Sequence, residues 1–320
     1  MARALITGIT GFAGSHLADQ LAIDQGWDVW GIGLPSDSLR NVAHLGDRVH
    51  IELADLSDIQ VCHRLLKAAQ PTHIFHLAAQ ASVARSWSEP AVTLVNNITA
   101  EANLFSALTA SSLRPRVLVV GSADEYGLVD PDQIPISEDT PLRPINPYAV
   151  SKITQDFLGL QYYLSHQIPV IRVRPFNHIG PRQAPGFAIP DFSRQIARIE
   201  MGQQEPIIQV GNLQSCRAFS DVRDIVVAYR LALCEGAPGE AYNIGSDQPV
   251  RIADVLGMLL AKSSAQIRVE QRPDRMRPSD IPILSCDSSK LERDTGWKPR
   301  YTLDTSLQDV LDYWRTSVAD

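Results

Sequence analysis

Short apolar runs alternate with longer segments of mixed polarity through the first half of the chain. The runs are rich in Val, Ile and Leu, have the length of buried strands, and cover residues 4–7, 29–32, 49–53, 74–78, 117–121 and 170–173. The segments between them have helix length and include residues 16–25, 59–69 and 91–110. Strands that alternate with helices predict βαβ units around a parallel sheet. We therefore expect an α/β fold with a doubly wound parallel sheet.

The pattern loosens after residue 175, where Pro and Gly are more scattered. Helices are predicted at 190–201, 222–234, 252–262 and 303–314, and a short strand at 206–210. We interpret residues 1–175 as the sheet domain, to which a segment of about 212–245 returns. Residues 176–320 then form most of a smaller C-terminal α/β lobe. The chain contains no internal repeat or low-complexity tract, which favours one cooperative unit.

Composition and charge narrow the range of functions. A formal net charge of -7 over 320 residues argues against a nucleic-acid partner. The four cysteines are too widely spaced to predict a metal site, and we expect free thiols. The first apolar run is too short for a signal or membrane segment, so we expect no membrane partner and a cytoplasmic location.

A glycine-rich turn links the first predicted strand to the first helix. Its glycines follow a GxxGxxG spacing, which permits a tight turn and close approach of the backbone to a pyrophosphate. The free amides at the start of the helix would add a partial positive charge. The predicted cofactor contacts here are Gly8, Thr10, Gly11, Phe12, Ala13 and Gly14.

The residues after the second strand bear on the choice between NADP(H) and NAD(H). Segment 31–36 contains no acid that would bind a ribose 2′-hydroxyl and repel a 2′-phosphate. NADP(H) is therefore favoured over NAD(H), with Ser36 and Arg40 as phosphate contacts, although Asp37 lies nearby. After the third strand, Asp55 and Leu56 are placed to meet the adenine.

A second group of residues predicts proton-transfer chemistry. Tyr148 and Lys152 form a YxxxK pair, and a spacing of four places both side chains on one helix face. A neighbouring cation would lower the pKa of the tyrosine toward neutral pH, where it could transfer a proton. Ser122 follows the strand at 117–121 and reaches the carboxyl edge of the sheet, where open α/β folds bind ligands. Its hydroxyl could hold a substrate oxygen against Tyr148.

These motifs resemble the extended short-chain dehydrogenase/reductase superfamily, also called the NAD-dependent epimerase/dehydratase family. Segments 76–80 and 174–181, together with Asn97, resemble its nucleotide-sugar branch, so that the resemblance covers the whole chain. It implies a Rossmann domain, a substrate-binding lobe, and a homodimer built on two helices from each subunit. It also implies further cofactor contacts at Leu77, Ala78, Ala79, Asn97, Tyr148, Lys152, Pro175 and His178.

The C-terminal half resembles enzymes of GDP-mannose conversion in segments 204–213, 217–224, 277–280 and 295–299. The implied reaction is NAD(P)H-dependent reduction of the C4 ketone of GDP-4-keto-6-deoxy-D-mannose to GDP-D-rhamnose or its C4 epimer. Arg217 and Arg277 are suited to a diphosphate, Asn177 can donate to it, and Asp280 can accept from ribose or guanine. Further substrate contacts are expected at Ser122, Glu125, Val210 and Asn212.

Two other functions stay open. A GDP-mannose 4,6-dehydratase, or a related dehydratase or epimerase, needs an extra acid or base, and Asp124 stands two residues after Ser122 in the corresponding place. Asp124 and Asp280 both stand where the resemblance leads one to expect a glutamate. A non-catalytic cofactor-binding sensor would require a broken Ser–Tyr–Lys set, whereas Ser122, Tyr148 and Lys152 are all present.

Overall fold

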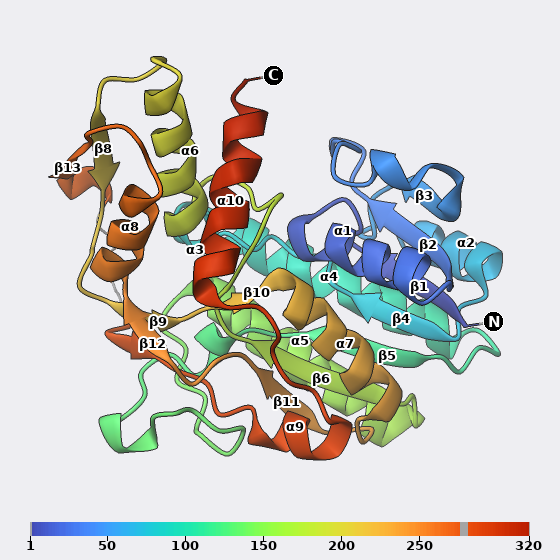
Figure 1. The fold of residues 1–320 in the computed structure, drawn as a ribbon. Helices are drawn as coiled ribbons and strands as arrows, with labels where there is room; N and C mark the ends of the chain where they lie inside the picture. Colours follow the sequence, from blue (N-terminus) through green and yellow to red (C-terminus); the bar gives the residue numbers. More distant parts are fainter. Residues whose placement is uncertain (1, 276–280, 320) are drawn as a thin grey trace.

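A seven-stranded parallel sheet forms the centre of the protein (Figure 1). The structure is a computed structural model that describes residues 2–275 and 281–319. The strand order is β11-β6-β5-β4-β1-β2-β3. The bounds are β1 Arg3–Thr7, β2 Asp28–Gly33, β3 Val49–Leu53, β4 His73–His76, β5 Arg116–Val120, β6 Val170–Pro175 and β11 Ala241–Ile244. The order runs outward in both directions from β1 and β4, so the predicted doubly wound α/β fold is confirmed.

Helices cover both faces of this sheet. Figure 1 shows α1 (Phe12–Asp19) and α7 (Val222–Glu235) side by side on one face, where α9 (Ser289–Thr295) also packs. The other face carries α2 (Ile59–Ala69), α4 (Pro90–Thr109) and α5 (Pro147–His166). Each layer has its own buried apolar cluster, as expected for a sheet whose strands are apolar on both faces.

The C-terminal lobe is built mainly from three helices and a two-stranded parallel sheet. The helices are α6 (Ala188–Glu200), α8 (Ile252–Ala261) and α10 (Leu303–Ser317), and β8 (Ile207–Val210) pairs with β13 (Arg268–Gln271). Their apolar faces enclose a core that includes Ile196, Leu256 and Leu307. In Figure 1 this lobe lies beside the end of the sheet to which the strands point.

Short elements join the lobe to the sheet domain. β7 (His178–Ile179) pairs with β10 (Ser220–Asp221), and β9 (Cys216–Ala218) lies between β12 (Pro249–Arg251) and β14 (Ile283–Leu284). The remaining elements are α3 Val83–Ser88, the π-helical η1 Gln20–Asp24, and the 3-10 helices η2 Ala43–Arg48, η3 Ala123–Glu125, η4 Pro131–Gln133 and η5 Pro273–Arg275. Within the described ranges, no helix is long and apolar enough to cross a lipid bilayer.

The chain passes between sheet domain and lobe more than once. Both α7 and β11 lie within the segment of about 212–245 that was expected to return to the sheet. α9, which was expected in the lobe, packs against α7 and β11 instead. Buried Leu291 and Trp297 anchor this part of the chain to the cluster that also contains the α7 side chains. The sheet domain therefore takes more of its core from the last third of the chain than the sequence pattern indicated.

Candidate active site

The glycine-rich turn between β1 and α1 leaves space that only glycine permits. Gly8 adopts a φ of +74°, in the left-handed region that side chains avoid. A Cβ on Gly14 would lie 2.1 Å from the carbonyl oxygen of Gly8, so the start of α1 packs directly on the turn. Gly11, at the N-cap of α1, is exposed. The turn thus offers the amides of the first helical turn to a ligand, and it fits the predicted pyrophosphate.

Thr7 fixes the ends of the two central strands next to this turn. Its hydroxyl accepts hydrogen bonds from the amides of Leu77 and Ala78, both at 3.1 Å, and lies 2.9 Å from Nδ1 of His76. The predicted cofactor segment at Leu77, Ala78 and Ala79 is half-buried and follows β4 at the carboxyl edge. β1 and β4 are neighbours at which the strand order changes direction, which is the usual place for a ligand in such sheets.

Asn97 holds this edge to helix α5. Its side-chain oxygen accepts from the amide of Gln80 at 2.7 Å, and its side-chain nitrogen donates to the hydroxyl of Ser151 at 2.9 Å. The side chain is almost fully buried. Asn97 was predicted to contact the cofactor, whereas its amide is committed here to bonds among α4, α5 and the segment after β4.

The loop after β2 contains one acid that is already engaged. The carboxylate of Asp37 accepts a hydrogen bond from the Thr10 hydroxyl at 2.6 Å and another from the amide of Leu34 at 2.9 Å. Ser36 and Arg40 are exposed in the same loop. Asp37 therefore links the loop to the glycine-rich turn, and both hydrogen bonds are accepted by its Oδ2 atom.

Ser122 begins a one-turn helix, η3, directly after β5. Its hydroxyl accepts from the amide of Asp124 at 3.2 Å, and the carboxylate of Glu125 accepts from the amide of Ser122 at 2.7 Å. This reciprocal capping box fixes the orientation of the Ser122–Glu125 segment. Glu125 has no exposed surface and lies 3.3 Å from the guanidinium of Arg174. Such a placement argues against the predicted substrate contact at Glu125, because its side chain has no exposed surface and one carboxyl oxygen already caps the Ser122 amide.

Helix α5 presents Tyr148 and Lys152 beneath the end of β5. The helix starts at Pro147, and the side chain of Asn146 accepts from the amide of Ala149 at 2.7 Å as its N-cap. The Lys152 ammonium donates to the carbonyl of Val120 at 2.8 Å. Ser122 and Lys152 are thus attached to the same strand end.

The surroundings of Tyr148 keep its hydroxyl protonated. Burial raises the pKa of Tyr148 above its ordinary value, the Asp124 carboxylate raises it further, and a hydrogen bond with Ser122 opposes both effects. The sequence suggested a pKa lowered by Lys152, so the direction in the structure is the opposite. Burial lowers the pKa of Lys152 to about 8, against the attraction of Glu101 and Glu125. The site therefore holds a proton donor, Tyr148, in contact with Ser122.

Buried charges form a network beside Tyr148 and Lys152. Asp156 on α5 bonds to both Arg172 and Arg174 of β6, and the guanidinium of Arg174 also donates to the Tyr126 hydroxyl at 3.0 Å. All these side chains are largely removed from water. Buried charges of this kind need partners, and here the arginines compensate the carboxylates.

Candidate substrate residues lie where the lobe joins the sheet. Within the described part of the chain, the side-chain oxygens of Asn177 and Ser220 are buried without a hydrogen-bond partner. Buried polar atoms left unpaired are unusual, and a polar ligand would satisfy them. His178 stacks on Phe12 with ring centroids 5.7 Å apart, which connects this region to the start of α1.

The remaining predicted contacts are distributed along the lobe. Arg217 on β9 is half-buried and donates to the carbonyls of Cys216 and Ile281 at 2.9 and 2.7 Å. The Val210 side chain is buried in the lobe core, and its backbone carbonyl accepts from the amide of Arg272 at 2.9 Å, which argues against the predicted substrate contact. Arg277 and Asp280 lie outside the described residues.

Four further predicted residues have local roles. Leu56 and Pro175 are buried, Asp55 is exposed and accepts from the amide of Ser57, and the side chain of Asn212 accepts from the amide of Gln214. None of these contacts conflicts with a ligand at the adjacent surface.

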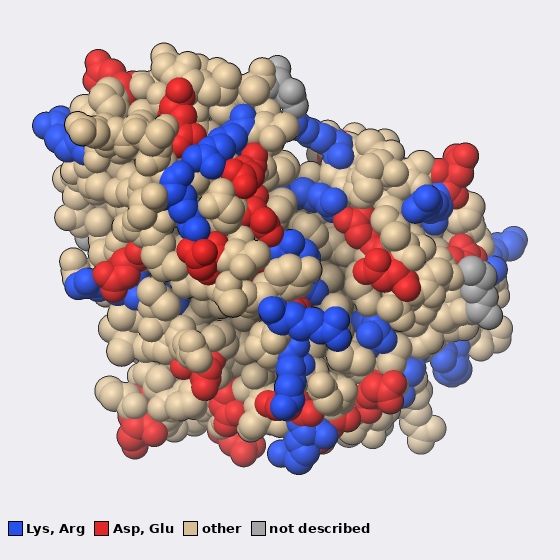
Figure 2. All heavy atoms as spheres, viewed as in Figure 1, with Lys and Arg blue, Asp and Glu red and all other residues tan. Residues whose placement is uncertain are grey.

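A hollow separates the sheet domain from the lobe beside α10. Its lining includes Arg40 from the loop after β2, Pro181, Arg223 at the start of α7, and Tyr313 of α10. Figure 2 shows a notch between the two parts, bordered by Lys or Arg side chains. The loop that carries Arg40 therefore faces the lobe across an open gap.

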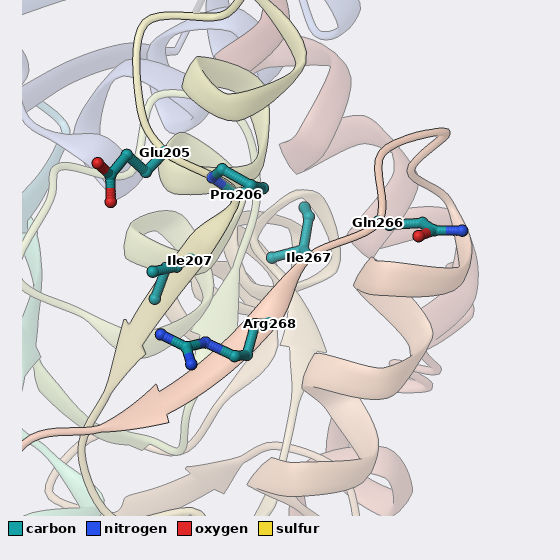
Figure 3. A pocket seen from close by; sticks show the side chains of 6 residues that line it. All are labelled: Glu205, Pro206, Ile207, Gln266, Ile267 and Arg268. Carbon is teal, nitrogen blue, oxygen red and sulfur yellow. The ribbon is translucent and has the colours of Figure 1, made fainter.

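Another hollow lies on the outer side of the lobe, between the starts of β8 and β13 (Figure 3). Pro206, Ile207 and Ile267 form its apolar part, and Glu205, Gln266 and Arg268 surround them. It contains none of the predicted site residues.

Two features of the site were not predicted. The first is Glu101, which lies on the buried face of α4, one turn after Asn97. The second is Arg172, which lies two residues before Arg174 and on the same face of the buried strand β6. Each leaves a signal in the sequence. A glutamate at the i+4 position from a buried asparagine, and two arginines two apart in a Val/Ile strand, both require buried partners.

Comparisons with known proteins agree with this arrangement. The family model for GDP-mannose 4,6 dehydratase matches residues 5–310. GDP-6-deoxy-D-mannose reductase of Pseudomonas aeruginosa is 35% identical over 318 residues, covering 99% of each chain. The match extends through both the glycine-rich turn and the lobe.

Solved structures give the same result for the fold. A structure of RMD from Pseudomonas aeruginosa in complex with NADPH superposes with a TM-score of 0.85 at 31% identity, covering 99% of this chain and 100% of the other. UDP-glucose 4-epimerase of Thermus thermophilus in complex with NAD superposes with a TM-score of 0.87 at 26% identity, covering 98% and 99%. Similar folds thus bind either nicotinamide cofactor.

Proposed function

The chain belongs to the GDP-mannose 4,6-dehydratase family, and we propose that it is a reductase acting on the 4-keto group of a GDP-sugar. Its substrate is GDP-4-keto-6-deoxy-D-mannose, and its product is GDP-D-rhamnose or the C4 epimer. The observation that carries the proposal is the meeting of Ser122 and Tyr148 beside Lys152 at the end of β5. The similarity to a GDP-6-deoxy-D-mannose reductase along the whole chain supports the choice of substrate.

The glycine turn at Gly8–Gly14 would hold the pyrophosphate of a nicotinamide cofactor, and the segment after β4 would lie along it. When bound, the cofactor supplies the hydride that reduces C4. Tyr148 donates its proton to the C4 oxygen, so the phenolic O–H bond breaks as the new hydroxyl forms. Ser122 donates a hydrogen bond to the same oxygen and orients it.

Lys152 balances the negative charge left on Tyr148 after proton transfer. The raised pKa of Tyr148 suits this direction of reaction, because a reduction starts from the protonated phenol. Asn177 and Arg217, at the junction with the lobe, would bind the diphosphate, and Arg277 and Asp280 are proposed to add contacts to the diphosphate and to ribose or guanine.

The test is to mix the protein with GDP-4-keto-6-deoxy-D-mannose and NADPH and to follow the loss of NADPH absorbance. We expect the reaction to fall by two or more powers of ten in Tyr148→Phe, which lacks the transferable proton. Tyr162→Phe is the matched control, because Tyr162 lies on the same helix but stacks on Phe105. An inactive wild-type protein, or equal rates in Tyr148→Phe and wild type, would contradict the proposal.

Dehydration of GDP-mannose is the second candidate function, and Asp124 is the observation that favours it. The Asp124 carboxylate acts directly on the Tyr148 hydroxyl and could serve as an additional acid or base. A parallel reaction with GDP-mannose and NADP+ separates the candidates. Consumption of GDP-mannose without net change in the cofactor, abolished in Asp124→Asn, would identify a dehydratase.

NADP(H) is proposed as the preferred cofactor. The loop after β2 carries Ser36 and Arg40 at its surface, and its acid, Asp37, already accepts bonds from Thr10 and Leu34. The NADPH complex of the relative from Pseudomonas aeruginosa supports this preference.

A homodimer is proposed on the outer face of α4 and α5. Large apolar side chains are exposed there on both helices: Val92, Val95, Val150, Phe157 and Leu164. Exposed apolar groups clustered on adjacent helices are typical of protein interfaces. A second copy of the chain can cover them by an isologous contact.

A further inference from the structure

Glu101 is a fully buried carboxyl group in the middle of α4. It lies on the face of the helix that also carries Asn97 and Leu104, and this face packs against α5. The side chain has no exposed surface. An isolated carboxylate in such a place is costly, so it needs either a partner or a proton.

Its immediate contacts provide no compensating charge. Within the described part of the chain, neither oxygen of Glu101 has a hydrogen-bond partner of normal geometry, although the Gln155 amide lies beside it. Nε2 of His76 lies 3.9 Å from Oε2. Burial lowers the pKa of His76 to about 3, so this imidazole is neutral and forms no ion pair.

The charged groups that act on Glu101 come from α5 and η3. Lys152 attracts it, whereas Asp156 and Glu125 repel it. Asp156 is bonded to two arginines, and Glu125 has Arg174 and the Ser122 amide. Burial and the Asp156 carboxylate nevertheless raise the pKa of Glu125 to about 8, against the attraction of Arg174. Among the three buried carboxyls near Lys152, Glu101 alone has no arginine partner in the described structure. Burial accordingly raises the pKa of Glu101 well above its usual range, opposed by Lys152.

Helices α2 and α3 also pack against α4, but the arginine of each helix pairs with a carboxylate other than Glu101. Arg64 of α2 pairs with Glu52 at 2.5 Å, and Arg85 of α3 pairs with Glu89 at 2.8 Å, both at the surface. The titratable side chains of these helices that remain are His63, Lys67 and the buried Cys62, whose thiol donates to the Leu56 carbonyl.

We propose that Glu101 is a positioning residue for Lys152: once its carboxyl group has lost its proton to solvent, the carboxylate holds Lys152 in the charged form. At lower pH both groups carry their protons, and Glu101 is a neutral side chain. As the pH rises, ionisation of Glu101 places a negative charge beside the ammonium and makes its deprotonation harder. Glu101 thereby extends the pH range over which Lys152 can support Tyr148. The inference rests on the proposed reductase function.

The first test compares the pH dependence of kcat in wild type and Glu101→Gln. Glutamine reproduces the neutral acid, so kcat at low pH should stay within about twofold. It cannot ionise, so the alkaline limb should move to lower pH by about one unit, with about tenfold loss at the alkaline end. KM should change little, because Glu101 is not placed to touch the substrate. Glu101→Met, which also cannot ionise, should show the same shift.

The second test needs no activity and uses thermal unfolding of the full chain. Because the folded-state pKa of Glu101 is raised above its ordinary 4.5, wild type loses stability as the pH rises from that value toward the raised one. The Gln variant lacks this loss. The Tm of Glu101→Gln relative to wild type should therefore increase with pH over this range.

Glu200→Gln is the control, since Glu200 is a partly buried carboxylate of the lobe bonded to Arg315 and Ser263. It should lower Tm without moving the alkaline limb. Profiles of both Glu101 variants that run parallel to wild type at every pH would overturn the inference, as would a Tm difference independent of pH. If wild type fails to reduce the keto sugar, the proposed reaction and the role in it fail together, while the Tm series still decides whether Glu101 is a buried acid.

Discussion

Arg40 is the residue whose replacement tests the cofactor preference most directly. It is exposed in the loop after β2 and lines the hollow between the sheet domain and the lobe. If its guanidinium binds a 2′-phosphate, Arg40→Ala should raise the KM for NADPH by about one to two powers of ten and leave the KM for NADH nearly unchanged, since one charge-assisted hydrogen bond is worth roughly 1.5–3 kcal/mol. Steady-state rates with both cofactors measure this.

Arg48→Ala serves as the matched control, because Arg48 is an exposed arginine at the end of η2, further along the same connection. It should affect neither KM. An equal rise for NADPH and NADH in Arg40→Ala would mean that Arg40 acts on the shared part of the cofactor or on the loop itself, and would count against the proposed NADP(H) preference.

At the residue scale, the sequence pattern predicted the positions of the residues proposed for catalysis better than it predicted the buried charges around them. Tyr148, Lys152 and Ser122 were found because a motif fixes their spacing and a strand end fixes their place. Glu101 was missed, and Glu125 was assigned to the substrate, because burial of a charge depends on partners that arrive from other elements. Arg174 meets Glu125 only after β5 and β6 have paired.

The N-cap of α5 stabilises the helical turn that carries Tyr148, the proposed proton donor. Asn146 accepts from the amide of Ala149, the residue that directly follows Tyr148 in the first turn of the helix. Asn146→Ala should lower the free energy of unfolding by about 1 kcal/mol. It should also lower kcat by about tenfold or more, because a small displacement of Tyr148 is costly for a group that transfers a proton. Calorimetry and steady-state rates measure the two effects.

Thr302 provides the comparison, since its side chain caps α10 in the lobe by accepting from the amide of Thr305 at 3.2 Å. Thr302→Ala should reduce stability by a similar amount and leave kcat close to that of wild type. Loss of activity in both variants in proportion to stability would show that the Asn146 effect is general unfolding rather than placement of Tyr148.

Elements with strong periodicity were predicted closely, and short ones were not. The helix expected at 59–69 matches α2 at both ends, where Asp58 caps the start and Gln70 ends it with a φ of +43°. β7 and β10 contain two residues each, and nothing in so short a run distinguishes strand from loop. Their pairing is set by tertiary contacts between the lobe and the sheet domain.

At the scale of the whole molecule, the proposed dimer depends on the combined outer surface of α4 and α5. Phe157 and Leu164 are 50% and 68% exposed on α5, which is unusual for such large apolar side chains. If they form the dimer contact, Phe157→Glu combined with Leu164→Glu should convert a sedimenting dimer into a monomer, because unpaired charges would be buried in an apolar interface. Sedimentation velocity resolves the two species.

A glutamate at Val269 is the corresponding control, since Val269 is a large exposed apolar residue on β13 in the other lobe. It should leave the dimer intact. A wild-type protein that sediments as a monomer at micromolar concentration, or a double variant that remains dimeric, would contradict the assignment of this face.

The late position of β11 in the chain has a consequence during synthesis. β11 completes the sheet beside β6, but about 70 residues separate the end of one strand from the end of the other. At roughly 5–20 residues per second, a ribosome needs about 4–14 seconds to make them. Throughout that interval the nascent sheet has β6 as an unpaired edge, which is a template for wrong pairing with other chains. We therefore expect β6 to need protection from other chains until β11 has been synthesised and can pair with it.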